Sequence, residues 1–141
     1  MMAIELSELE MRILSVLDEA GEEDVLTTLN TVSDLVGSRE ELENYQKSLR
    51  TLIEKALVKL DLDSMPTGPI ALTTNEVATE IDKLSRNVVF VAQGEHWTDI
   101  REKGPPYFQI LLPRLVVTET GDALAFKILE ERGYQWWRNK G

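Results

Sequence analysis

The alternation of apolar and polar positions is clearest over residues 38–56, where it predicts an amphipathic helix. Apolar side chains recur there at intervals of three or four residues, which places them on one face of a helix. These residues are Leu42, Tyr45, Leu49, Leu52, Ile53 and Ala56. Ser38 and Glu41 have the spacing of a capping box. We therefore expect a helix over Ser38–Lys55 whose opposite side is polar and exposed.

Two further helices are predicted upstream. Over Ser7–Ala20, Ser7 can cap the helix and Gly21 can end it. Over residues 22–36, acidic side chains at the start suit a helix N-terminus. Apolar residues then continue at helical spacing as far as Val36. Gly37 would give a tight joint with the third helix, as a helix-turn-helix requires.

A β-hairpin is predicted after the third helix. Residues 57–60 are apolar, residues 61–64 lead into the turn signal at Met65–Pro69, and Ile70–Leu72 forms a second short strand. Thr73 or Thr74 can cap a fourth helix, because apolar residues return to helical spacing as far as Val88. The segment 87–92 fits either an extension of that helix or a strand.

The C-terminal part of the chain predicts a loop, a strand and a helix. Residues 94–106 have the composition of a loop. Tyr107–Val117 is expected to be a strand, which Pro113 would place at a sheet edge or divide in two. Thr118 can cap a final helix that ends at Gly133.

The composition narrows the class of protein. With 141 residues the chain can form one domain with a small appendage, so we expect a domain over 1–86 and a C-terminal extension over 87–141. The absence of cysteine and the single histidine, His96, exclude disulfides, thiolate sites and histidine clusters. Neither a Ser-His-Asp pattern nor a glycine-rich phosphate loop is present, so we expect a non-enzyme without metal or cofactor. No signal peptide or membrane-length apolar run is present, which predicts a cytoplasmic protein without a membrane partner.

The net charge of −10 argues against long-range attraction to DNA. Its distribution is uneven, because the first 36 residues hold nine acidic residues and one base, Arg12. Residues 37–60 hold four acidic residues and five bases. Local contact of the third helix with DNA therefore stays possible, whereas the acidic segments suit a basic protein partner.

Two segments resemble the winged-helix superfamily, in the style of bacterial MarR- or PadR-like regulators. Leu49–Val58 resembles the leucine-spaced helix and the strand start of that family, and Val117–Ala125 resembles its threonine-to-glycine entry into the last helix. The resemblance implies an α+β winged helix-turn-helix: a three-helix core with a β-hairpin wing, plus a C-terminal strand and helix. It also implies transcriptional regulation by binding to double-stranded DNA. This chain differs in having Ala56 where such regulators usually have glycine, and in lacking basic residues in the hairpin.

The third helix would enter the major groove with the polar side opposite its leucines. The expected DNA contacts are Arg39, Asn44, Lys47, Ser48, Arg50, Thr51 and Lys55. Alternatively this side is simply a solvated surface, since Glu40 and Glu43 would repel phosphates.

A homodimer is expected from the aromatic C-terminus, because interfaces favour Trp and Tyr. The expected interface residues are Leu124, Ile128, Tyr134, Trp136 and Trp137. Alternatively the tryptophans pack on the core of their own chain, as Trp97 beside His96 is also expected to do.

Three functional hypotheses remain open. The first is a DNA-binding regulator, and the second is an acidic winged-helix module that binds protein and not DNA. A third is a ligand sensor that holds a small apolar effector between the C-terminal helix and the core.

Overall fold

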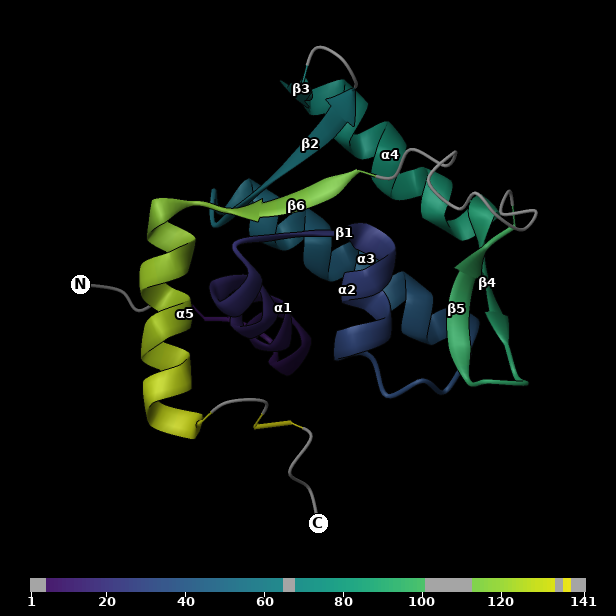
Figure 1. Cartoon of the computed structure of the whole chain (residues 1–141), viewed down its shortest axis with the longest axis horizontal. Helices are drawn as coiled ribbons and strands as arrows, with labels where there is room; N and C mark the ends of the chain where they lie inside the picture. Colours follow the sequence, from purple (N-terminus) through teal and green to yellow (C-terminus); the bar gives the residue numbers. More distant parts are fainter. Residues whose placement is uncertain (1–4, 65–67, 101–112, 134–135, 138–141) are drawn as a thin grey trace.

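The computed structural model describes residues 5–64, 68–100, 113–133 and 136–137, which form a mixed α+β fold with two antiparallel sheets (Figure 1). The helices are α1 (Glu8–Ala20), α2 (Val25–Val32), α3 (Arg39–Glu54), α4 (Thr74–Asn87) and α5 (Glu119–Arg132). The strands are β1 (Glu22–Asp24), β2 (Val58–Ser64), β3 (Gly68–Ala71), β4 (Val88–Val91), β5 (His96–Asp99) and β6 (Arg114–Val117).

The larger sheet brings together strands from the N-terminal and C-terminal parts of the chain. Its strand order is β1-β6-β2-β3, so the last strand of the sequence lies between β1 and β2. Leu115 of β6 faces Glu23 on one side and Leu60 on the other. Strand β6 therefore pairs with β1, the strand between α1 and α2 in the sequence, and α5 packs beside α1 (Figure 1).

The smaller sheet is the β4–β5 hairpin, which lies at the opposite end of the molecule from α5 (Figure 1). The side-chain amide of Asn30 in α2 makes the two backbone hydrogen bonds to Trp97 that a neighbouring strand would make. Its amide donates to the carbonyl oxygen of Trp97 at 2.9 Å, and its Oδ1 accepts from the Trp97 N–H at 2.7 Å. The Trp97 ring packs edge-to-face against Phe90, with the centroids 5.3 Å apart.

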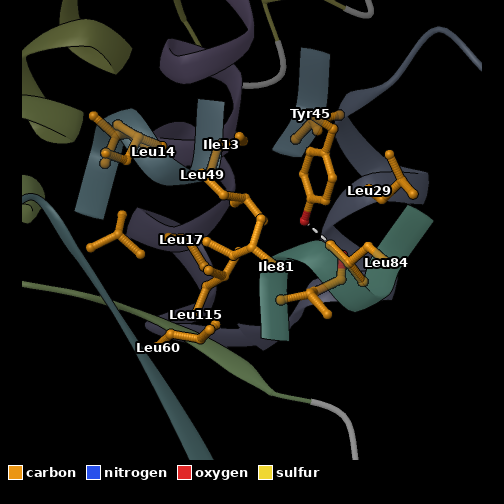
Figure 2. Packing of buried hydrophobic residues seen from close by; sticks show 14 of the residues in the cluster. Ile13, Leu14, Leu17, Leu29, Tyr45, Leu49, Leu60, Ile81, Leu84 and Leu115 are labelled. Carbon is orange, nitrogen blue, oxygen red and sulfur yellow. Dashed lines mark hydrogen bonds between the residues drawn. The ribbon is translucent and has the colours of Figure 1, made fainter. Parts of the chain in front are cut away.

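One hydrophobic core unites α1, α2, α3, the larger sheet and α4 (Figure 2). Leucine and isoleucine side chains from all of these elements surround the buried stripe of α3. Tyr45 is fully buried in this core, and its hydroxyl donates to the carbonyl oxygen of Val25 at 2.6 Å. Because a buried hydroxyl needs a partner, this bond ties α3 to the first turn of α2.

The end of α3 forms a tight junction with β2, β6 and α5. The N–H of Leu57 donates to Leu52 and that of Ala56 donates to Ile53, which is the pattern of a Schellman motif. Ala56 accordingly has a left-handed backbone, with φ 58°. Its carbonyl oxygen accepts from the Thr118 hydroxyl at 2.7 Å, and a Cβ on Gly121 would overlap the Leu57 carbonyl.

The predicted helix caps are confirmed. Ser7, Ser38, Thr73 and Thr118 each accept a hydrogen bond from a backbone N–H in the first turn of the helix that follows. Both predicted hairpin strands are present as well, with Leu62 of β2 opposite Ile70 of β3.

The prediction of one helix over residues 22–36 is wrong at both ends. Glu22–Asp24 is strand β1, which pairs with β6, and Asp24 is the N-cap of α2. The helix ends at Val32, and the backbone at Leu35 is left-handed with φ 56°. The predicted tight joint is therefore a longer turn between Ser33 and Ser38. At the other end of the predicted helix, pairing with β6 overrides the helical spacing.

Three C-terminal predictions are settled or changed. The ambiguous segment 87–92 contains strand β4, whereas His96–Asp99, predicted as loop, is strand β5. Only residues 113–117 of the predicted strand Tyr107–Val117 lie among the described residues. Pro113 precedes an interior strand rather than an edge strand, and its carbonyl oxygen accepts from the Val25 N–H at 3.0 Å.

The left-handed Ala56 yields a stability prediction. We expect Ala56→Gly to stabilise the protein by about 0.5–1 kcal/mol, because glycine adopts this conformation without the Cβ penalty. The matched control is Ala78→Gly on the exposed surface of α4, which should destabilise by a similar amount. Urea unfolding of both variants tests the opposite signs, and a loss of stability in Ala56→Gly would contradict the assigned cap.

Two carboxyl groups, Asp18 of α1 and Asp122 of α5, interact where the two helices pack together. Burial raises the pKa of Asp18, and a hydrogen bond and repulsion from Asp122 raise it further, with a smaller contribution from Glu19. A carboxyl whose pKa is raised by folding stabilises the protein fully below its unfolded value, and that stability is lost as the pH rises through the folded pKa. Asp18 therefore weakens the α1–α5 contact at neutral pH.

We expect Asp18→Asn to stabilise the protein at pH 7 by about 0.5–1 kcal/mol, because it removes the repulsion and a negative charge near a helix C-terminus. Glu19→Gln removes the same charge from the same helix end but leaves the Asp18–Asp122 pair intact, so its gain should be smaller. Thermal unfolding followed by circular dichroism at pH 7 and about pH 3 makes the comparison. The advantage of Asp18→Asn should disappear at the lower pH, where the Asp18 carboxyl, with its raised pKa, is protonated.

Candidate nucleic-acid interface

The polar side of α3 is accessible. We call its exposed residues the α3 face: Arg39, Glu40, Glu43, Asn44, Lys47, Arg50, Glu54 and Lys55. Thr51 at its border is half-buried, and the apolar stripe on the other side of the helix is buried in the core. Within the part of the chain that the structure describes, no element lies over this face, which presents four basic and three acidic side chains.

Glu41 links the start of α3 to the preceding turn and to the β4–β5 hairpin. Ser38 accepts from the Glu41 N–H at 3.1 Å, which is one half of the predicted capping box. The Glu41 carboxylate, however, accepts from the N–H groups of Val36 and Gly37 and from the Trp97 indole, at 3.0–3.1 Å. Glu41 therefore ties the turn before α3 to the β4–β5 hairpin, and this orients the helix.

Most cations of the α3 face already contact oxygens of this chain. Arg39 pairs with Glu43 at 3.1 Å, and Arg50 of α3 pairs with Asp82 of α4. The Lys55 ammonium donates to the carbonyl oxygen of Glu5 at 2.7 Å. Among the described residues Lys47, near the centre of the face, has no ion pair, so it is the cation most available to a partner.

Helix α4 lies along one flank of the α3 face. Gln46 is buried and its amide donates to the carbonyl oxygen of Ile81 at 2.8 Å, while Ile81 and Leu84 enter the common core. The neighbouring residue Asp82 contacts Arg50 one turn farther along α3. The position of α4 could not be predicted from local spacing, because these contacts join distant parts of the sequence.

The other flank is a hollow of about 600 Å³ between α1, the turn after α2 and the start of α3. Asn44, Lys47 and the buried Ser48 line it, together with carboxylates of Glu8, Asp34 and Glu40. Ser48 was predicted to contact DNA, but it is only 5% exposed and packs within the protein. The carboxylates give this flank a negative rim.

Arg12 anchors this flank, a role that sequence analysis missed. Its guanidinium is buried and donates to the Val32 carbonyl oxygen at 2.8 Å, to Asp34 at 3.0 Å and to Glu8 at 2.7 Å. The signal that could have identified it is its isolation, because it is the lone base among nine acidic residues in the first 36. A single base in such surroundings is well placed to be held by several carboxylates.

The predicted dimer residues are mostly in contact with their own chain. Ile128 and Trp137 are buried, with Trp137 only 7% exposed, and Leu124 is half-buried. Trp136 donates to the Ser15 hydroxyl at 3.2 Å and lies under Arg132, whereas Tyr134 lies outside the described residues. These contacts match the alternative of packing on the chain's own core.

The structure also bears on His96, on metal binding and on membrane-spanning helices. His96 is exposed beside the buried Trp97. Within the described ranges, no group of three or more His, Asp or Glu side chains is placed to hold a metal ion. No described helix has both the length and the apolar character needed to cross a bilayer.

No protein-family model matches the chain, and neither the curated proteins nor the solved structures yield a match. The winged-helix resemblance therefore stays a prediction, and function has to be argued from the geometry of α3 and its flanks.

Proposed function

We propose that this chain is a cytoplasmic DNA-binding transcriptional regulator of the winged-helix type, which lays α3 in the DNA major groove. The observation that carries the proposal is the accessible polar face of α3 on a helix whose other side is fixed in the core. A helix of this kind that follows a shorter helix after a turn is the reading element of helix-turn-helix proteins.

The larger sheet supports the same proposal. A small antiparallel sheet follows α3, and β2 and β6 pair directly within it. This interpretation replaces the β2–β3 hairpin, which was predicted to be the wing. Strands β2 and β6 become the base of the wing, and β3, α4 and the β4–β5 hairpin are inserted between them. The segment Val117–Ala125, which resembles the family's entry into its last helix, then directly follows the wing.

The α3 face offers chemistry for both kinds of DNA contact. Asn44 and Thr51 can hydrogen-bond to base edges, and Lys47 can contact a base or a phosphate. Arg39, Arg50 and Lys55 can reach phosphates if they exchange their present partners. Such exchange is inexpensive, because an exposed ion pair is worth only about 0.2–1 kcal/mol.

Lys47 provides the direct test. We expect Lys47→Ala to weaken binding to random duplex DNA by about 3- to 10-fold and to reduce the salt slope by about 0.9, because one phosphate contact is lost. The measurement is fluorescence anisotropy of labelled duplex at two salt concentrations. Lys127→Ala removes an equal charge from the exposed side of α5 and should bind like the unaltered protein. Equal affinities of the two variants would contradict the proposal.

A second candidate function is an interaction module for a basic protein. The negative rim beside α3 and the internal pairing of its cations favour it, since such a surface attracts Lys and Arg side chains. The same measurement separates the two functions. If the unaltered protein does not bind duplex DNA at low salt but binds a Lys/Arg-rich peptide, the result would favour this second function.

We further propose a homodimer, because helix-turn-helix regulators commonly bind two half-sites as dimers. Support comes from α5, where Phe126 is 62% exposed and Leu124 is half-buried. Sedimentation velocity at tens of micromolar, about the range of ordinary dimer affinities, should show a dimer. A monomer alone would remove the homodimer without affecting the DNA-binding test.

A further inference from the structure

Asp82 of α4 contacts Arg50, one of the cations of the α3 face. Arg50 lies at the border of the α3 face that adjoins α4, one turn from Lys47. Its guanidinium is paired with the Asp82 carboxylate, which carries the same charge as a phosphate and accepts the same N–H groups. When α3 enters a groove, cations at the border of the helix face the phosphates of the groove wall.

The position of Asp82 is fixed by its neighbours. Ile81 places its side chain in the core, and its carbonyl oxygen accepts the buried amide of Gln46 at 2.8 Å. Gln46 is one helical turn before Arg50, so α4 docks on α3 directly beside the ion pair. The contact is therefore part of a packed interface between two helices.

The ion pair is nevertheless reversible. Arg50 is 44% exposed and Asp82 is 62% exposed, so water and salt screen their attraction. A duplex phosphate can replace the carboxylate, and the release of counterions from DNA favours that exchange at low salt. The contact would lower DNA affinity without abolishing it.

We propose that α4 is an autoinhibitory element, whose Asp82 engages Arg50 in place of a DNA phosphate. This inference rests on the proposed function, because it concerns the regulation of the same α3 face. Any event that moves or neutralises Asp82 would then increase affinity through one specific cation.

The test compares two variants of α4 that remove the same charge. Asp82→Asn removes the partner of Arg50. Glu80→Gln, the matched control, removes a carboxylate that pairs with Lys83 of the same helix at 2.7 Å. Binding of random duplex DNA is measured by fluorescence anisotropy between about 50 mM and about 200 mM salt.

We expect Asp82→Asn to bind about 2- to 5-fold more tightly than Glu80→Gln, because Arg50 no longer has to exchange a carboxylate partner for the phosphate. Because Asp82 is 62% exposed and Glu80 only 15%, the melting temperature of each variant is measured as well, to confirm that both stay folded. In a background of Arg50→Gln, the difference between the two α4 variants should vanish.

The possible failures are distinguishable. Equal affinities of the two α4 variants, with Lys47→Ala still weakening binding, would overturn the autoinhibition and leave the proposed function standing. If Asp82→Asn still increased DNA affinity in the Arg50→Gln background, the autoinhibition would also be overturned, since the effect would not depend on Arg50. Absence of DNA binding by every variant would overturn both proposals.

Discussion

The junction at the end of α3 is the constraint on which the rest of the structure depends. Ala56 turns the chain out of the helix with a left-handed backbone, and Leu57 starts the approach to β2. The Thr118 hydroxyl donates to the Ala56 carbonyl, and the Thr118 N–H donates to Leu57 at 3.0 Å. Gly121 leaves the space for this close approach. One cluster of backbone contacts therefore fixes the direction of α3, the alignment of β2 with β6 and the start of α5.

Local signals in the sequence predicted the helices well and the sheets only in part. The caps at Ser7, Thr73 and Thr118 depend on a side chain and an N–H three residues later, so sequence spacing is enough to identify them. Strand β1 has no such local signal. Residues 22–24 are acidic and become a strand only because β6, far along the chain, supplies hydrogen bonds to them. The strand at His96–Asp99 was missed for the same reason, because it depends on pairing with β4.

The candidate site could be predicted in outline but not in its electrostatics. The spacing of leucines in α3 correctly indicated which side of the helix is exposed, with Ser48 as the residue that packs instead. It could not indicate that Asp82 and the Glu5 carbonyl would contact the cations Arg50 and Lys55. These partners come from other elements, so they depend on how α4 and the start of the chain pack. The charge of a helix face in isolation is therefore a poor guide to the cations available for a ligand.

The hydrogen bond from the Trp97 indole to Glu41 has a consequence for how the chain folds during synthesis. Glu41 holds the turn that leads into α3, and Gly37 in that turn lies so close to the Phe90 ring that no Cβ would fit between them. Both aromatic residues emerge from the ribosome well after α3 is complete. The nascent helix pair thus lacks its lateral support until the hairpin arrives. Such dependence on distant contacts slows folding relative to a bundle of the same helices.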